Sequence, residues 1–227
     1  MLYFFVVKNY YLFRHGQTFF SKFQIPYGKH NLNAKILPEG KASLLRIGEF
    51  LKGVCWDCNI SSEFLRCKQS VKIIEEISGK DFVFDPRLNE YYKVNFDDFK
   101  KRIANFLEEI NKDPKNETVV ICTHGAVIAG LKHLITEGQF NIREILDYPS
   151  TGVLLCIENK KIEERNFNLS TSLFKFISKA ENHDRKVVDE CFPAIPPLAG
   201  EQTANTSFAC EAGLRRYHGR KPVELHK

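Results

Sequence analysis

Short apolar runs alternate with stretches of helical period along the first 180 residues of the chain. The apolar runs end at polar positions, as buried strands of a parallel sheet do. They span residues 10–13, 59–61, 82–84 and 118–122. Residues 1–7 are apolar too, and because neither a basic leader nor a small-residue cleavage site accompanies them, we interpret them as buried strand rather than an export signal.

The helical stretches carry apolar residues three or four positions apart, so that one face of each helix packs on the sheet. Ser62 and Asn95 are predicted caps, since short polar side chains accept hydrogen bonds from the first turn. The predicted helices start at Pro38, at Ser62 (to about residue 77), at Asn95 and at Gly125 (to about residue 135), and a last one contains Leu173 and Ile177.

A hairpin is predicted near the end of this region. Residues 152–157 and 161–167 flank a turn at Asn159 and Lys160, which indicates an antiparallel pair at the edge of the sheet. The alternation of strands and helices before it is typical of a sheet covered on both faces. We therefore expect an α/β fold, a three-layer α/β/α sandwich with a mostly parallel sheet.

The composition changes near residue 180. Residues 181–227 lack an apolar period, contain Pro193, Pro196 and Pro197, and carry as many basic as acidic residues. We expect residues 1–180 to form one domain and residues 181–227 to be a poorly ordered tail. A lid over the active site and a segment introduced by a frameshift are the alternatives for the tail.

Charge and hydropathy exclude two classes of partner. The net charge of +5 is mild, and no basic run is interleaved with aromatic residues, so nucleic acid is not an expected partner. No stretch approaches the roughly 20 apolar residues that a membrane helix needs. We expect a cytoplasmic protein, whose oligomeric state stays open.

The seven cysteines are odd in number and scattered, which does not fit a disulfide framework. Cys55 and Cys58 form the only close pair. A zinc site would need a second pair or histidines at ligand spacing, and a redox pair would lie between a strand and a helix start. We interpret the cysteines as reduced and incidental, and expect neither a metal nor a cofactor.

Two histidines follow predicted strands: His15 after residues 10–13 and His124 after residues 118–122. In an open α/β sheet the carboxyl ends of the strands border one crevice, and the helix starts there favour anions. A neutral imidazole is a competent nucleophile toward phosphorus. The two histidines therefore indicate a phosphate site.

Three further residues suit that chemistry. Arg14 and Arg66 carry planar guanidinium groups that match phosphate oxygens, and Arg66 lies one turn into its predicted helix, from where it can point back to the same edge. Glu90 follows a strand end and is the candidate to protonate a leaving oxygen. Each residue alone is more often structural or solvated, but together they predict a site for phosphoryl transfer.

Residues 12–18, Leu-Phe-Arg-His-Gly-Gln-Thr, resemble the signature of the histidine phosphatase superfamily, in its phosphoglycerate-mutase-like branch. Further segments resemble the family's other motifs in the same order. They are residues 37–40, 61–70, 87–91 and 119–125. The resemblance covers residues 8–168 and implies a phosphoglycerate-mutase-like fold.

The resemblance also implies a role for each candidate. His15 would be the phosphorylated nucleophile, Arg14, Arg66 and His124 would hold the phosphate, and Glu90 would donate the proton. The remaining residues implied for the substrate site and its entrance are Gln17, Thr18, Ser21 and Gly125.

Departures from the family pattern bear on the reaction. Ser21 stands where the family often has Asn, and Glu63 where it often has Pro, and neither change removes a catalytic group. Only 34 positions separate Glu90 from His124, whereas larger members, including the mutases, usually insert a capping segment there. We therefore expect an open site and a phosphatase acting on a small phosphorylated metabolite or a phosphoprotein. A phosphoglycerate mutase and a non-catalytic phosphate-binding module are the alternatives.

Overall fold

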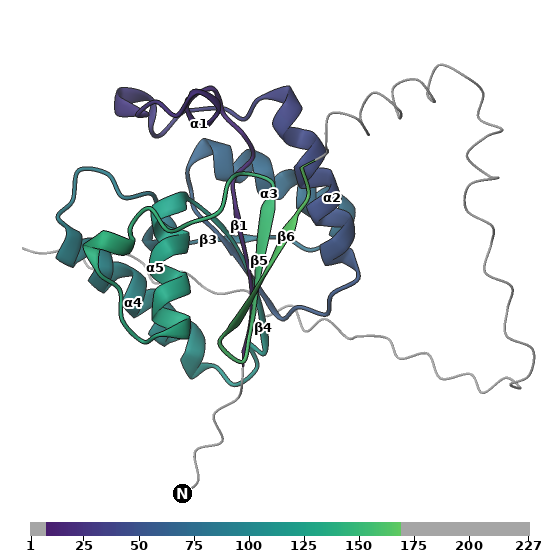
Figure 1. Ribbon diagram of the computed structural model, residues 1–227. Helices are drawn as coiled ribbons and strands as arrows, with labels where there is room; N and C mark the ends of the chain where they lie inside the picture. Colours follow the sequence, from purple (N-terminus) through teal and green to yellow (C-terminus); the bar gives the residue numbers. More distant parts are fainter. Residues whose placement is uncertain (1–7, 169–227) are drawn as a thin grey trace, which may run out of the picture. The chain divides into compact units, whose positions relative to one another are not determined.

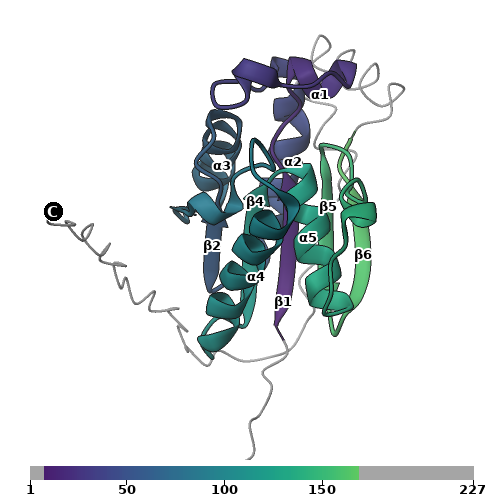
Figure 2. The ribbon, with the colours of Figure 1, turned by 90° about the vertical axis from the view of Figure 1, so that its left-hand side faces the viewer.

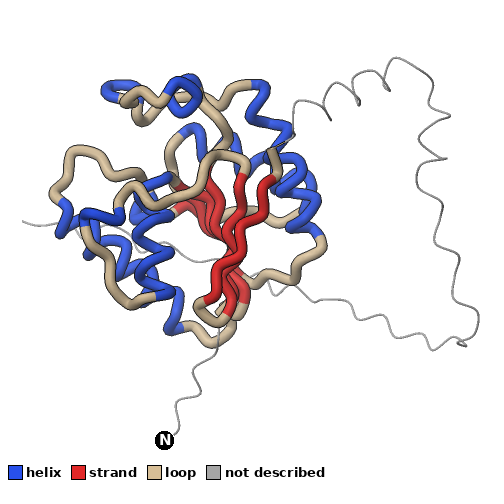
Figure 3. Tube along the Cα trace, viewed as in Figure 1, coloured by secondary structure: helices blue, strands red, loops and turns tan. Residues whose placement is uncertain are grey.

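A computed structural model of the chain describes residues 8–168, and these form a six-stranded sheet between helices (Figures 1 and 3). The strand order is β3-β2-β4-β1-β5-β6, in which β1 to β4 are parallel to one another, while β5 is antiparallel to both of its neighbours, β1 and β6. The strands are β1 (Asn9–Arg14), β2 (Cys58–Ser61), β3 (Val83–Phe84), β4 (Thr118–Thr123), β5 (Val153–Glu158) and β6 (Lys161–Asn166).

Helices cover both faces of the sheet, with α4 and α5 on one side and α2 and α3 on the other (Figure 1). The α-helices are α1 (Phe19–Phe23), α2 (Lys41–Lys52), α3 (Leu65–Ser78), α4 (Phe96–Lys112) and α5 (Gly125–Thr136). Short 3-10 turns are η1 (Gly28–His30), η2 (Pro38–Gly40), η3 (Pro86–Leu88) and η4 (Ile142–Glu144). The predicted α/β/α sandwich with a mostly parallel sheet is confirmed.

The central strand β4 shows why the sequence folds into layers. All six of its residues are buried, and alternate side chains enter opposite cores. Val119 and Ile121 pack with the α4 and α5 side, and Val120 and Cys122 with the α2 and α3 side. Because successive side chains of a strand point to opposite faces, an uninterrupted apolar run is what a doubly covered strand requires.

A predicted helix cap and a predicted hairpin turn are found in the structure. Asn95 caps α4, since its side chain accepts the Asp98 backbone N–H at 2.8 Å. Asn159 and Lys160 have φ values of 51° and 64°, the left-handed conformation that a two-residue hairpin turn needs.

Several predicted boundaries were wrong. Ser62 does not cap α3, which starts at Leu65 after Phe64. The Ser62 hydroxyl accepts the Phe64 backbone N–H at 3.3 Å ahead of the helix and bonds the side chains of Asn89 and His124. The helix at Pro38 begins as the turn η2, and α2 itself starts at Lys41. Strand β3 leaves out Phe82, and β6 stops at Asn166. The strand expected over residues 1–7, the helix around residues 173–177 and the tail lie outside the described residues.

The topology gathers the carboxyl ends of the parallel strands at one edge of the sheet. Arg14 at the end of β1 is in register with Thr123 at the end of the neighbouring β4. Helix α1 lies beyond this edge, above the strands as drawn in Figures 1 and 2. Within residues 8–168 no helix is long and apolar enough to cross a membrane.

The Asn95 cap allows a test of this fold. Asn95→Ala removes the acceptor for the Asp98 N–H, and we expect it to lower the free energy of unfolding by about 1 kcal/mol, measured by urea denaturation. Asn105→Ala, at an exposed position inside the same helix, is the matched control and should cause no loss, because alanine has the higher helix propensity. An equal loss in both variants would contradict the cap.

Candidate active site

The β1–β4 pair brings the two predicted histidines together. The His15 backbone N–H donates to the Thr123 carbonyl at 3.0 Å, which continues the pairing of the two strands by one residue. His124 follows Thr123 directly and is the N-cap residue of α5. The imidazole rings consequently lie with their centroids 5.3 Å apart.

His15 is held with one ring nitrogen unbound. Its Nδ1 lies 2.9 Å from the Gly16 carbonyl oxygen, an acceptor, so Nδ1 carries the proton and donates it. Its Nε2 is buried and has no hydrogen-bond partner. The neutral ring therefore has the Nε2 lone pair available, as a nucleophile needs.

Its surroundings keep His15 neutral. Burial is the largest effect that lowers the pKa of His15 well below its usual value, and the positive charges of Arg66 and Arg14 lower it further. A neutral imidazole beside two guanidinium groups remains a base down to low pH.

His124 is oriented by a chain of hydrogen bonds. The Ser62 hydroxyl donates to Asn89 Oδ1 at 2.8 Å and lies 2.7 Å from His124 Nε2. Because that hydroxyl has one proton, Nε2–H is the donor to Ser62. The other nitrogen, Nδ1, is buried without a partner. Burial, followed by the charge of Arg66, holds the pKa of His124 well below its usual value.

Arg66 is fully buried at the start of α3. Its guanidinium donates to the backbone oxygen of Asn31 and, at 3.0 Å, to the Asn31 side-chain oxygen. The centroids of the Tyr27 and Phe64 rings lie 4.3 and 5.1 Å from the guanidinium carbon of Arg66. Asn31 therefore fixes one side of the guanidinium, and Nε stays without a partner.

Arg14 is held more loosely. Its guanidinium carbon lies 5.0 Å from the centroid of the Tyr148 ring, and its buried Nε has no hydrogen-bond partner. In residues 8–168 the buried side-chain nitrogens without a partner are those of Arg14, His15, Trp56, Arg66, Arg102 and His124. Four of these six side chains are predicted site residues, and the two guanidinium Nε–H groups among them are unbound buried donors of the kind that suit a phosphate.

Glu90 is the predicted proton donor, and the charges of Arg66 and Arg14 act on its carboxyl group. Its Oε1 accepts the Tyr91 backbone N–H at 2.9 Å. Burial raises the pKa of Glu90 above its usual value, while the Tyr91 N–H and then the charges of Arg66, Arg14 and Arg102 act in the opposite direction. A carboxyl group that keeps its proton to higher pH is suited to act as a general acid.

The predicted entrance residues have structural contacts. Thr18 is fully buried, and with Ser21 it forms the capping box of α1. The Thr18 hydroxyl also lies 2.7 Å from the hydroxyl of Tyr27, so Thr18 helps to position the Tyr27 ring beside Arg66. A Cβ on Gly125 would come within 2.6 Å of the Tyr148 ring. Gln17 is partly exposed. Substrate contacts by these residues stay a prediction.

As expected, no capping segment is inserted between Glu90 and His124, but three of the predicted site residues are not open to solvent. His15, Arg66 and His124 have no exposed surface. Three partly exposed rings contact these groups and Arg14, and we call them the aromatic collar: Tyr27, Phe64 and Tyr148. Two of these rings come from loops with no periodic pattern, so the cover could not be predicted from periodicity.

Four contributing residues were missed: Asn31, Ser62, Asn89 and Arg102. Ser62 and Asn89 lie inside the quoted motifs, so their proximity to the candidates was visible. Asn31 lies in a loop far along the chain from Arg66, and no local signal links the two. Arg102 projects from α4, where an arginine normally indicates solvent.

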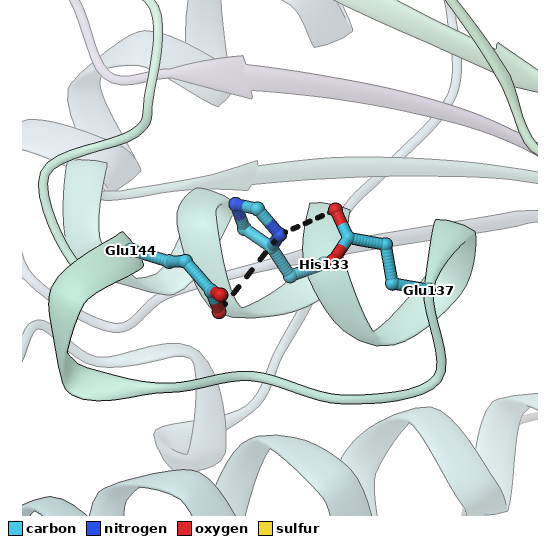
Figure 4. Close-up of side chains that lie close together, drawn as sticks. All are labelled: His133, Glu137 and Glu144. Atoms are coloured by element: carbon cyan, nitrogen blue, oxygen red, sulfur yellow. Dashed lines mark hydrogen bonds and ion pairs between the residues drawn. The ribbon is translucent and has the colours of Figure 1, made fainter.

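A second cluster of polar residues lies toward the other end of α5, away from His124 (Figure 4). His133 Nδ1 is 2.8 Å from Glu137 Oε1 and 3.9 Å from Glu144 Oε2, and its Nε2 is 2.7 Å from Asp147 Oδ2. Of the described residues, His133, Glu137 and Glu144 form the group that could hold a metal ion. The catalytic candidates contribute nothing to it.

Comparisons with known proteins bear on the site. The family model for the histidine phosphatase superfamily (branch 1) matches residues 10–94 and 93–169. The uncharacterized phosphatase PhoE of Bacillus subtilis (strain 168) is 24% identical over 194 residues, which cover 73% of this chain and 97% of PhoE.

Solved structures share the fold. A putative alpha-ribazole-5'-P phosphatase from Escherichia coli superimposes with a TM-score of 0.60 at 15% identity, covering 71% of this chain and 97% of that one. The mycobacterial glucosyl-3-phosphoglycerate phosphatase Rv2419c gives a TM-score of 0.53 at 15% identity, with 70% and 96% covered. The phosphoglycerate-mutase-like α/β fold expected from the motifs is thereby confirmed.

The low pKa of His15 predicts a pH-dependent stability. Below an unfolded value of about 6.5, the unfolded chain binds a proton that folded His15 does not, so stability falls as the pH falls. Between about pH 7.5 and pH 5.5 this histidine should account for a loss of about 1 kcal/mol. We expect His15→Gln to remove that part of the loss in urea denaturation.

The exposed histidine His30 supplies the matched control. His30→Gln should keep the pH dependence of the wild type. The buried-base assignment would be wrong if His15→Gln and His30→Gln lost the same stability on acidification.

Proposed function

The chain belongs to branch 1 of the histidine phosphatase superfamily, and from that premise we propose that it hydrolyses phosphate monoesters through a phosphohistidine formed on His15. One observation carries the proposal. The Nε2 atom of His15 is buried, unprotonated and without a hydrogen-bond partner, beside the guanidinium groups of Arg14 and Arg66.

In the first step the Nε2 lone pair of His15 attacks phosphorus, and the bond from phosphorus to the leaving oxygen breaks. Glu90 gives its proton to that oxygen, so the leaving group departs as a neutral alcohol. In the second step a water attacks the phosphohistidine and transfers a proton to the Glu90 carboxylate. The N–P bond breaks, and inorganic phosphate leaves with His15 restored.

Arg14, Arg66 and His124 stabilise the transferring group. Their unpartnered nitrogens are donors or potential donors to the phosphoryl oxygens. His124 can donate from Nδ1 only as an imidazolium, because Nε2–H is engaged with Ser62. A bound phosphate dianion supplies the negative charge that favours this protonation, and no metal ion is needed for the step.

Hydrolysis is favoured over mutase chemistry by the segment between Glu90 and His124. It consists of the loop to Phe96, α4, a short connection and β4, without a further element to retain an intermediate. The relative PhoE is named a phosphatase. A purely binding module would not need the complete set of nucleophile, arginines and acid.

Small phosphorylated metabolites are the proposed substrates, and a phosphoprotein, including one carrying phosphohistidine, is the second possibility. Two proteins of the same fold are named for phosphorylated metabolites, alpha-ribazole-5'-P and glucosyl-3-phosphoglycerate. We also propose that the protein acts in the cytoplasm and that nucleic acid is not among its partners.

The nucleophile can be tested by substitution. His15→Ala should reduce phosphate release from an aryl phosphate to background while the circular dichroism spectrum and the thermal midpoint stay close to those of the wild type. Brief exposure of the wild type to a radiolabelled phosphate ester, followed by a denaturing quench at alkaline pH, should leave label on His15. Asn105→Ala, at an exposed position of α4, is the control. Hydrolysis by His15→Ala at the wild-type rate would refute the assignment.

The acid can be tested by its pH profile. His15 must be neutral and Glu90 protonated, so kcat/KM should decline on both sides of an optimum on the acid side of neutral. The lowered pKa of His15 sets the acid limb, and the raised pKa of Glu90 displaces the alkaline limb upward. A rate that is flat from about pH 4 to pH 9 would contradict the pair.

Glu90→Gln cannot donate a proton. It should slow hydrolysis of an alkyl phosphate by roughly 100-fold or more and abolish the alkaline limb. An ester with a strongly acidic leaving group, such as p-nitrophenyl phosphate, should lose much less, because its leaving group departs as an anion. Equal losses on both esters would exclude Glu90 as the acid.

A further inference from the structure

The rings of the aromatic collar stand where the leaving group of a substrate has to lie. The phosphate-binding groups His15, Arg66 and His124 are fully buried, while the rings in contact with them are partly exposed. Phosphate that reaches the buried groups leaves its ester substituent at the level of these rings. The collar therefore decides what kind of substituent is accepted.

Each phosphate-binding group has a ring against it. Tyr27 lies edge-on to His15 with centroids 6.4 Å apart and also covers Arg66. Phe64 lies 5.2 Å from the ring of His124, and Tyr148 lies over the guanidinium of Arg14. The boundary of the site is thus made of ring surfaces coming from three separate segments.

The Tyr27 ring is reinforced from behind. Phe20 stacks on Tyr27 with centroids 4.8 Å apart and an interplanar angle of 29°, and His30 stacks on Phe20 at 5.6 Å. The Tyr27 hydroxyl is fixed by Thr18. A ring held in a stack keeps its orientation, so Tyr27 offers a preformed ring edge at little loss of side-chain entropy.

Three neutral polar side chains near the buried cations already have partners inside the protein. Tyr27 is bonded to Thr18, Asn31 to Arg66, and Ser62 to His124 and Asn89. Of the six described side chains with an unpartnered buried nitrogen, four are the groups proposed to take the phosphate, and the other two are Trp56 and Arg102. A substituent rich in hydroxyl groups would lose its water here and find ring carbon in return, which disfavours it.

We infer that the site selects phosphate monoesters whose leaving group, an alcohol or a phenol, carries an aromatic ring. The faces of Tyr27 are taken by Phe20 and Arg66, so a planar substituent pairs with the edge of Tyr27 and with the ring of Phe64, and gains contact energy that an aliphatic group of equal size does not. The inference rests on the proposed function and names the substrate class of the same site.

Three esters of primary alcohols test the inference, since their leaving groups are chemically alike: benzyl phosphate, cyclohexylmethyl phosphate and glucose 6-phosphate. We expect kcat/KM for benzyl phosphate to exceed that for cyclohexylmethyl phosphate by roughly two- to tenfold, the range of one aromatic pair. Glucose 6-phosphate should be the poorest. Benzyl phosphate at or below either of the other two would overturn the inference.

A substitution in the aromatic collar tests whether Phe64 causes the preference for the benzyl ester. Phe64→Leu keeps an apolar side chain beside His124 and Arg66 but removes the ring, so the benzyl-to-cyclohexylmethyl ratio should fall toward one. Phe23→Ala is the control, because Phe23 is exposed and its ring contacts are with Phe19 and Lys22. A ratio unchanged in Phe64→Leu would remove Phe64 from the assignment and contradict the collar.

A measurement of binding without hydrolysis separates this inference from the proposed function. Benzylphosphonate and methylphosphonate cannot be hydrolysed at their C–P bond, and isothermal titration should show the benzyl compound binding more tightly, by roughly two- to tenfold. Tighter benzyl binding without hydrolysis of any ester would refute the phosphatase and leave the collar preference standing. Ester hydrolysis that depends on His15, with equal binding of both phosphonates, would refute the collar alone.

Discussion

The site depends on positive charge that is buried without a counter-charge. Arg66 is fully enclosed and bonded to the neutral oxygens of Asn31, and Arg14 faces the ring of Tyr148. Buried charge of this kind is unfavourable unless other groups compensate for it. In the free protein that compensation comes from neutral acceptors and ring faces, which leaves the nitrogens of the site ready for a dianion.

The same constraint explains the protonation states around the cations. Two imidazoles beside Arg14 and Arg66 remain neutral, whereas Glu90, which the guanidinium charges would ionise, is buried enough to have a raised pKa. The proposed nucleophile, which lacks its proton, and the proposed acid, whose pKa is raised, thus owe these properties to one environment. The parallel pairing of β1 and β4 supplies the scaffold, because it fixes His15 and His124 at adjacent strand ends.

How much the sequence revealed follows from how local each feature is. His15 and His124 were predictable, since a polar residue at the end of an apolar run marks the carboxyl edge of a parallel sheet. The cap at Asn95 was local as well. Ser62 was misassigned because its hydroxyl has two possible uses, and the bond to His124 is decided by a residue 62 positions away. The ring of Tyr27 over Arg66 depends on a loop path that no periodicity encodes.

The two edges of the sheet differ in how they meet solvent. At one edge β3 contributes only two residues, too short to offer a row of hydrogen-bonding groups. At the other, every residue of β6 is exposed, and the strand carries Lys161, Glu163, Glu164 and Arg165. Charged side chains on an edge strand hinder pairing with a strand of another molecule. The strand order thus places the most apolar strands in the middle of the sheet. The edge strands have sequences that hinder aggregation by edge-to-edge pairing of sheets.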